Sequence, residues 1–224
     1  RDFKKLGRPR LFFAISPGAM DSMVNRYTAN RRLRSDDAYT PGGRHGMRPD
    51  YPSIVYTKIL KQLYPDVPVV LGGIEASLRR LTHYDYWQDS LRRCERPIVE
   101  ICRQLEGGTP FDQLRSIPQT VYLCREGDIP GGVGDDDIVL HSHEECLQNK
   151  KAQAENFRHI EEESNKMHAQ RLIQAVGKYC AVVNPPYPPM TTEELDASFD
   201  LPYTRMPHPK YKDKVIPAYE MIKF

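Results

Sequence analysis

The chain has 224 residues, with 32 Lys and Arg against 30 Asp and Glu and a formal net charge of +2. This balance excludes bulk charge as a basis for nucleic-acid or membrane binding, and no apolar run approaches the roughly 20 residues that span a bilayer. The five cysteines are scattered, form no C-x-x-C pair, and follow a polar start, RDFKKLGRPR. We therefore expect reduced thiols, no metal site in this chain and a cytoplasmic protein.

The first third of the chain predicts a strand, a helix and a second strand. Residues 9–16 (PRLFFAIS) and 67–73 (VPVVLGG) have the form of buried parallel strands. Residues 51–66 space their apolar side chains at helical intervals, with Ser53 available as the cap. The order predicts a βαβ unit.

The middle of the chain predicts further helices and strands. Residues 95–108 form an amphipathic pattern with a glycine stop, and residues 119–126 (QTVYLCRE) read as a strand. A long helix is expected from Glu144 to Ser164, capped by Ser142 and Glu145. A short helix at 169–177 (AQRLIQAVG) and a strand at 178–184 (KYCAVVN) follow, whereas 131–137 (GGVGDDD) is expected to be a flexible turn.

The last forty or so residues carry many of the 19 prolines and one helical turn capped by Thr191 or Thr192. We expect an extended arm over residues 184–224, whose end, VIPAYEMIKF, reads as a strand that is poorly covered in this chain. The predicted fold is α/β: a small, mostly parallel, Rossmann-like sheet flanked by helices over residues 1–183, followed by the proline-rich arm.

One candidate functional stretch follows the second strand. Gly72 and Gly73 stand where a parallel strand meets the next helix, which is the edge at which α/β sheets bind ligands. The sequence from there to Trp87 is rich in polar and aromatic residues. A domain interface would explain these residues as well as a ligand site would. The candidates are Gly72, Gly73, Glu75, Arg79, Arg80, His83, Tyr84, Asp85 and Tyr86.

The other candidate is the long loop at 17–50, because βα connections usually have about 2 to 6 residues. Its basic side chains suit phosphate or carboxylate groups, so we expect a ligand or interdomain role. The alternative is a solvated loop, because Asp21, Asp36 and Asp37 offset part of the charge. The candidates are Asn25, Arg26, Arg31, Arg32 and Arg34. No catalytic residue and no metal ligand is predicted, since helix capping explains the HSHEEC segment at 141–146.

Three long segments occur in a characteristic order: MDSMVNRYTANRRLRSDDAYTPGG, VVLGGIEASLRRLTHYDYW and DLPYTRMPHPKY with IPAYEMI. They closely resemble the N-terminal region of the YgiQ-type family of radical S-adenosylmethionine proteins, and the resemblance covers nearly the whole chain. In that family a C-x-x-x-C-x-x-C triad follows the segment matching IPAYEMIKF and holds a four-iron four-sulfur (4Fe-4S) cluster. None of the five cysteines here matches those ligands.

The chain departs from the family in two places. The resemblance leads us to expect an additional βα unit before RDFKKLG, and a strand with a glycine turn between the counterparts of SLRR (90–93) and ERPIVEI (95–101). Here Arg93 directly precedes Cys94, so a helix should lead straight into the next helix. Deletion of an interior strand would open the core of the sheet, so residues omitted from the written sequence explain this difference better.

The resemblance implies that the intact protein is a radical S-adenosylmethionine enzyme of unknown substrate. The 4Fe-4S cluster and S-adenosylmethionine would then belong to a barrel beyond Phe224, which is the expected partner of this chain. The chain itself would be an accessory domain, inactive alone and without a membrane partner. Two alternatives remain open: a Rossmann-like module for cobalamin or another small ligand, although no D-x-H-x-x-G segment is present, and an RNA-binding module that uses the arginine-rich loop.

Overall fold

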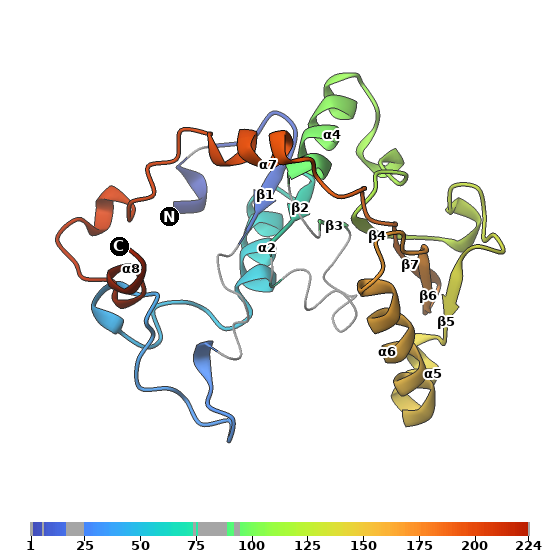
Figure 1. The fold of residues 1–224 in the computed structure, drawn as a ribbon, viewed down its shortest axis with the longest axis horizontal. Coiled ribbons are helices and arrows are strands. Elements are labelled where there is room, and N and C mark those ends of the chain that lie inside the picture. Colours follow the sequence, from blue (N-terminus) through green and yellow to red (C-terminus); the bar gives the residue numbers. More distant parts are fainter. Residues whose placement is uncertain are drawn as a thin grey trace.

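The structure is a computed structural model that describes residues 2–5, 7–16, 25–73, 75, 89–91 and 95–223. Its described strands form one seven-stranded sheet with the order β1-β2-β3-β4-β7-β6-β5 (Figure 1). Parallel pairs are β1 with β2, β2 with β3 and β5 with β6, and the other three neighbouring pairs are antiparallel. The α/β class is confirmed, but the prediction of a mostly parallel sheet is wrong.

The predicted βαβ unit is confirmed. Strand β1 (Phe13–Ile15) pairs in parallel with β2 (Val69–Leu71), and helix α2 (Pro52–Leu63) connects them. Ile15 and Leu71 are buried with Leu60 of the helix, so the apolar face of α2 covers the strands as the spacing requires. The cap differs from expectation, because Tyr51 precedes the helix in a left-handed conformation (φ 51°) and Ser53 lies buried inside its first turn.

A strand, β3 (Asp89–Leu91), lies between β2 and β4 and precedes helix α4 (Glu95–Glu106). The prediction that one helix leads straight into the next is therefore wrong. β3 is antiparallel to β4 and parallel to β2, so it joins the two halves of the sheet. The predicted helix at 95–108 is confirmed, and Ile101 on α4 is buried with Val70 and Ile117.

The predicted helix at 169–177 is a strand instead. It pairs with the following strand across a two-residue turn at Gly177 (φ 56°) and Lys178, and such a hairpin is antiparallel by construction. Leu172 and Ile173 are both buried on opposite faces, in separate clusters, which a single helical face would not allow. The half of the sheet beyond β3 consists of β4 (Thr120–Cys124), β5 (Ile138–Leu140), β6 (Leu172–Val176) and β7 (Tyr179–Val183).

The turn at 131–137 is fixed by one partly buried ion pair. Arg171 donates from Nε to Asp137 Oδ1 at 2.8 Å and from the terminal nitrogen to Oδ2 at 2.6 Å. The same guanidinium donates to the carbonyl oxygens of Pro130 and Gly132. The pair holds the pKa of the Asp137 carboxyl below its usual range. Hydrogen bonds and an ion pair therefore order this turn, which leads into β5. The sequence had predicted a flexible turn instead.

The long helix predicted from Glu144 to Ser164 is two helices, α5 (His143–Gln148) and α6 (Lys150–Ser164). The predicted cap at Ser142 is confirmed, since its Oγ accepts from the Glu145 amide at 3.1 Å. Asn149 breaks the helix and caps α6 by accepting from the Lys151 amide at 3.0 Å. Just before α5, His141 contacts carboxylates of both helices, Glu145 at 3.1 Å and Glu155 at 2.9 Å.

Residues beyond 184 run past α4 and end beside the loop at 37–43 (Figure 1). The capping box at Thr191 is confirmed at the start of α7 (Thr192–Phe199). Arg96 of α4 holds this segment: it pairs with Glu194, donates to the Pro188 carbonyl at 2.8 Å and lies 5.6 Å from the Tyr187 ring centroid.

The end of the described chain is a helix, α8 (Pro217–Ile222), so the prediction of a strand is wrong. Pro217 occupies the first turn, where its missing N–H costs nothing. The Ala218 amide donates to the Ala38 carbonyl at 2.9 Å. Met221 and Ile222 are 80% and 76% exposed, which confirms that this end is poorly covered.

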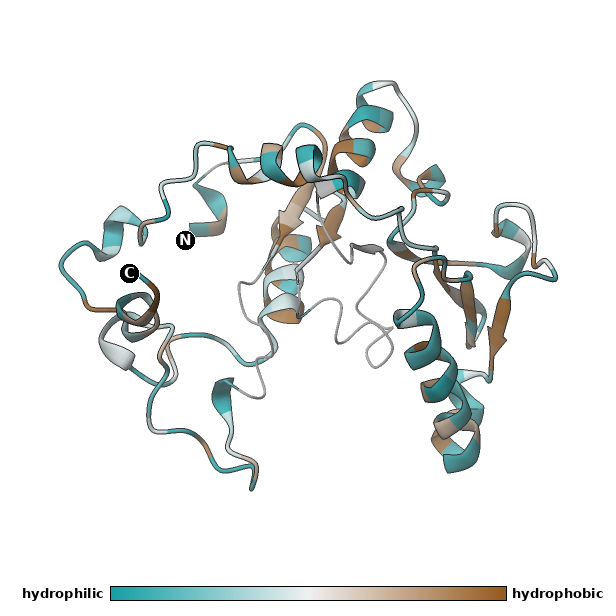
Figure 2. Cartoon of the chain, in the orientation of Figure 1, coloured by the Kyte–Doolittle hydropathy of each residue, from teal (hydrophilic) through white to brown (hydrophobic). Residues whose placement is uncertain are grey.

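Figure 2 shows that the apolar residues concentrate in the strands, whereas α6 is largely hydrophilic. No helix of the described residues is long and apolar enough to cross a membrane. The 3-10 turns are η1 (Asp2–Lys4), η2 (Pro41–Gly43), η4 (Phe111–Gln113), η5 (Glu126–Asp128) and η6 (Pro209–Tyr211).

Candidate functional site

The candidate site lies where β1 and β2 end and α2 begins. The Gly72 amide donates to the Ile15 carbonyl at 2.8 Å, so the two strand ends stay paired up to this edge. Gly73 has φ +87°, and a Cβ there would stand 2.9 Å from Ser16 Oγ. Only glycine fits this backbone position without strain, so the second predicted glycine has a definite structural role.

A buried carboxylate stands at the first turn of α2. Glu75 has no exposed surface, and its Oε2 accepts from Ser53 Oγ at 2.7 Å. A buried carboxylate requires such donors, and the amino end of a helix favours negative charge. Ser53 therefore binds Glu75 and links the segment after β2 to the helix that follows the long loop.

The first part of the long loop is a small hairpin. Tyr27 and Leu33 form a bridge, and the Arg34 amide donates to the Arg26 carbonyl at 2.9 Å. Tyr27 Oη donates to Asp50 Oδ2 at 2.9 Å, which fixes the hairpin to the residues before α2. Arg26 is thereby held at the base of the hairpin rather than at its tip.

The second part of the loop is organised by an ion pair. Arg48 donates from Nε to Asp37 Oδ2 and from a terminal nitrogen to Oδ1, both at 2.9 Å. The Asp37 side chain is 9% exposed and that of Arg48 is 25% exposed. Arg48 also lies over the Tyr39 ring at 5.4 Å from its centroid. Asp37 is therefore an internal partner of Arg48 and shapes the loop.

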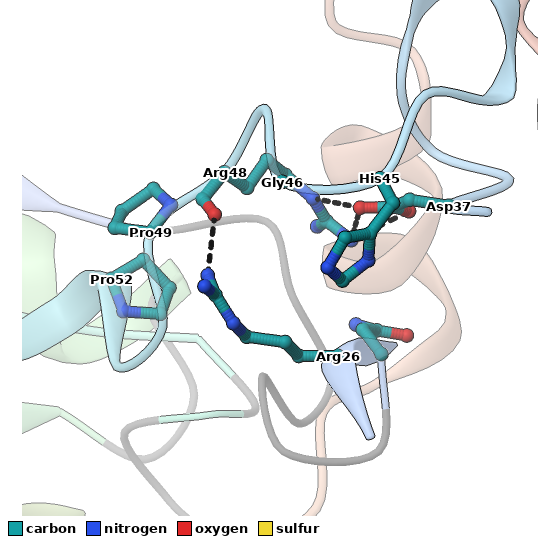
Figure 3. Close-up of a pocket in the computed structure, with 8 residues that line it drawn as sticks. Arg26, Asp37, His45, Gly46, Arg48, Pro49 and Pro52 are labelled. Atoms are coloured by element: carbon teal, nitrogen blue, oxygen red, sulfur yellow. Dashed lines mark hydrogen bonds and ion pairs between the residues drawn. The ribbon is translucent and has the colours of Figure 1, made fainter. Parts of the chain in front are cut away.

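These two parts enclose a small pocket that is open to solvent (Figure 3). Arg26 reaches across it and donates to the Arg48 carbonyl at 3.3 Å. Arg26 Nε is buried and meets no hydrogen-bond acceptor among the described residues. The lining residues are Asn25, Arg26, Asp37, His45, Gly46, Arg48, Pro49 and Pro52. Such a concave, cationic site suits a small anionic group.

The structure brings some of the predicted residues together and not others. Asn25 and Arg26 line the pocket, and Glu75 contacts the same turn of α2 through Ser53. Arg31 and Arg32 are exposed in the turn of the hairpin, and Arg34 donates from Nε to the Tyr27 carbonyl at 3.1 Å. Six further candidates lie outside the described residues: Arg79, Arg80, His83, Tyr84, Asp85 and Tyr86.

Three of the lining residues that sequence reasoning missed have ionisable side chains: Asp37, His45 and Arg48. All three belong to the loop that its length had singled out, but their charges gave no sign of which ones would pair. One signal in the sequence could have indicated the ion pair. Asp37 and Arg48 lie on either side of the Pro41-Gly42-Gly43 turn, and such a turn brings the segments on its two sides together.

The described cysteines do not suit an iron–sulfur cluster. Cys124 of β4 and Cys180 of β7 are paired in register on neighbouring strands, and burial raises the pKa of both thiols. Cys102 lies in α4 and Cys146 in α5. No group of three or more metal-ligating side chains occurs among the described residues, so that part of the chain offers no ligand set for a cluster.

Comparisons with known proteins give one consistent result. Residues 1–224 match the sequence pattern of the family described as Radical SAM N-terminal. A UPF0313 protein of Bacteroides thetaiotaomicron is 60% identical over 250 residues, covering 100% of this chain and 40% of the relative. One of Porphyromonas gingivalis is 61% identical over 238 residues, covering 100% and 37%.

A more distant relative, the UPF0313 protein YgiQ of Escherichia coli, is 38% identical over 289 residues, covering 100% of this chain and 39% of its own length. The chain thus spans about two fifths of the length of these relatives. No solved structure matches the chain significantly.

Proposed function

The chain belongs to the radical SAM N-terminal family, and from this membership we propose that it is the accessory N-terminal domain of a radical S-adenosylmethionine enzyme. One observation carries the proposal. Residues 1–224 match the family throughout, yet the chain covers only about 40% or less of the length of its relatives. The proposed catalytic barrel, with its 4Fe-4S cluster and S-adenosylmethionine, follows Phe224. When bound, such a cluster supplies the electron that generates a substrate-activating radical.

In this proposal residues 1–183 are the Rossmann-like body and residues 184–224 are the arm that leads to the barrel. Two features support the division. The segment is held on α4 by Arg96 and on the loop at 37–43 by backbone hydrogen bonds, so it follows a defined path. Its last helix leaves Met221 and Ile222 exposed, and large exposed apolar side chains of this kind suit a protein partner.

The surface that faces the barrel or its substrate is proposed to combine the loop at 25–34 with the stretch from Gly72 to Trp87. Support comes from the start of α2, where Tyr27 of the loop binds Asp50 and where Ser53 binds Glu75 of the stretch after β2. Side chains that position a substrate must be held rigidly. The ion pair between Arg48 and Asp37 holds two side chains of this loop in place.

A second candidate function is a module for a small ligand, which the pocket beside Arg26 favours. Cobalamin is one ligand that such α/β domains bind. Incubation of the 224-residue chain with cobalamin tests this version directly. A spectral change or retention of the cobalamin would support it, and the absence of both would exclude cobalamin as the ligand.

Anaerobic reconstitution with iron and sulfide tests the leading proposal. The 224-residue chain and the full-length protein are treated in parallel, and the visible absorption is compared. We expect the short chain to remain colourless and the full-length protein to gain the charge-transfer absorption of an iron–sulfur cluster. A stable band in the short chain, or none in the full-length protein, would contradict the assignment.

A further inference from the structure

Residues 185–223, which form nearly all of the proposed arm, expose their large apolar side chains. None of these residues, all of which the structure describes, is buried. Eight of their large apolar residues are 47% to 80% exposed: Leu195, Phe199, Leu201, Tyr203, Met206, Val215, Met221 and Ile222. Large apolar side chains that are exposed in such numbers mark a contact with another protein surface.

Both helices of the arm carry these side chains in a pattern that makes one apolar face. Leu195 and Phe199 of α7 are four positions apart, so they lie on the same side of that helix. On α8, Met221 and Ile222 follow Ala218 at the third and fourth positions. Neither helix has a buried residue. The two apolar faces are therefore open to a partner within the described part of the chain.

The arm nevertheless follows a defined path along the body (Figure 1). Polar contacts hold it at two places. Near its start, Arg96 of α4 binds Glu194 and the Pro188 carbonyl. Near α8, the Gly42 amide donates to the Val215 carbonyl at 2.6 Å.

These polar contacts leave the order of the arm without its usual source of stability. Fixing the backbone costs conformational entropy at every residue, and burial of apolar surface is what normally offsets that cost. Residues 185–223 are ordered along their path without burying any side chain fully. The arm therefore needs a further surface that covers its apolar side chains.

The longer relatives indicate what that surface is. The chain covers 40% and 37% of the two UPF0313 relatives, so about three fifths of such a protein lies outside it. Because this remainder is covalently linked to the arm, it meets the arm at a high effective concentration, which a second copy of the chain does not. A standard interface buries about 800 Å² on each partner, and eight large side chains that are each about half exposed or more present an area of that order.

We propose that the downstream part of the longer protein packs against the apolar face of the arm, with Phe199 of α7 and with Met221 and Ile222 of α8 as its main contacts. The partner surface is accordingly apolar. This inference rests on the proposed accessory role of the chain and deepens it, because it names the residues through which the two parts of the protein meet.

Hydrogen exchange followed by mass spectrometry tests the contact in the full-length protein and in the 224-residue chain. We expect backbone amides of α7 and α8 to exchange at least about tenfold more slowly in the full-length protein, because a covered helix opens less often than an uncovered one. Strands β6 and β7 are the internal reference. They should be protected in both proteins, which shows that both are folded.

Matched variants of the full-length protein identify the side chains that make the contact. Phe199 and Phe157 of α6 are both on helices and are 63% and 67% exposed. Phe199→Ser should speed exchange in α7 by about tenfold or more, since burial of one large apolar side chain is worth at least that factor. Met221→Ser should do the same in α8. Phe157→Ser should leave exchange in the arm within about twofold of the unmodified protein.

Three results would overturn the inference. These are equal exchange of the arm in the two proteins, equal effects of Phe199→Ser and Phe157→Ser, and slowing in the 224-residue chain that grows with its concentration. The last result would assign the apolar face to a second copy of the chain instead.

Cluster reconstitution is a separate measurement, so the two proposals can fail independently. A full-length protein that gains the cluster absorption while its arm exchanges as fast as in the short chain would contradict only the contact. A protected arm in a full-length protein that remains colourless would contradict only the assignment as a radical S-adenosylmethionine enzyme.

Discussion

Replacement of Arg171 by methionine should strongly destabilise the fold. Its side chain is 18% exposed and that of Asp137 is 8% exposed. Arg171→Met removes two hydrogen bonds to the carboxylate and two to the carbonyls of Pro130 and Gly132. Asp137 then retains the Gly134 amide, at 2.8 Å, as its donor. Removing one partner of a buried pair typically costs about 3 to 5 kcal/mol, and the partial exposure of Arg171 places this case near 3.

Urea denaturation followed by far-ultraviolet circular dichroism measures this loss, provided that the slope of the transition is unchanged. About 3 kcal/mol corresponds to a decrease in Tm of about 6 to 12 °C for a domain of this size. Arg103→Met is the matched control, because Arg103 binds Glu100 through the same two-pronged geometry but is 71% exposed. It should leave stability nearly unchanged. Equal effects of the two variants would refute the reasoning, since the pairs share their geometry but differ in burial and in the two carbonyl contacts that Arg171 makes.

Three further predictions concern other contacts. Ser53→Ala should lower the free energy of unfolding by about 1.5 to 3 kcal/mol, because Glu75 loses a donor while fully buried; urea denaturation showing no change would refute this. The pKa of His141 is raised, first by Glu155 and then by Glu145. Its contribution to stability is therefore full below about pH 6.5 and lost as pH rises through the higher folded-state pKa. His141→Gln should remove this decrease from pH-dependent denaturation curves, and identical curves would contradict it. Arg96→Met should speed limited proteolysis between residues 185 and 216, since it releases the segment from α4; an unchanged cleavage rate would show that other contacts hold it.

Local sequence signals were sufficient where the deciding contacts are close in the chain. The βαβ unit at 13–71 followed from apolar spacing, and the caps at Ser142 and Thr191 followed from residues three positions apart. The break at Asn149 is also local. It was missed because the helix formers on both sides of it outweighed one capping residue.

Long-range contacts decided the elements that were predicted wrongly. Residues 172–176 have the composition of a helix but pair with β7 and β5 and are buried on both faces. Residues 217–222 look like a strand, yet among the described residues no strand pairs with them, and a proline at the first turn favours a helix. Intrinsic propensity is a weak preference in both cases, and the pairing partners override it.

The candidate site divides in the same way. The sequence by itself determined that a long basic loop and two glycines follow the ends of the first two strands, because strand ends and loop length are local properties. Only the tertiary structure decided that Asp37 neutralises Arg48, that Ser53 binds Glu75, and that Arg26 lines a pocket beside them. A charge in a sequence has many possible partners, and burial together with the path of the backbone selects one.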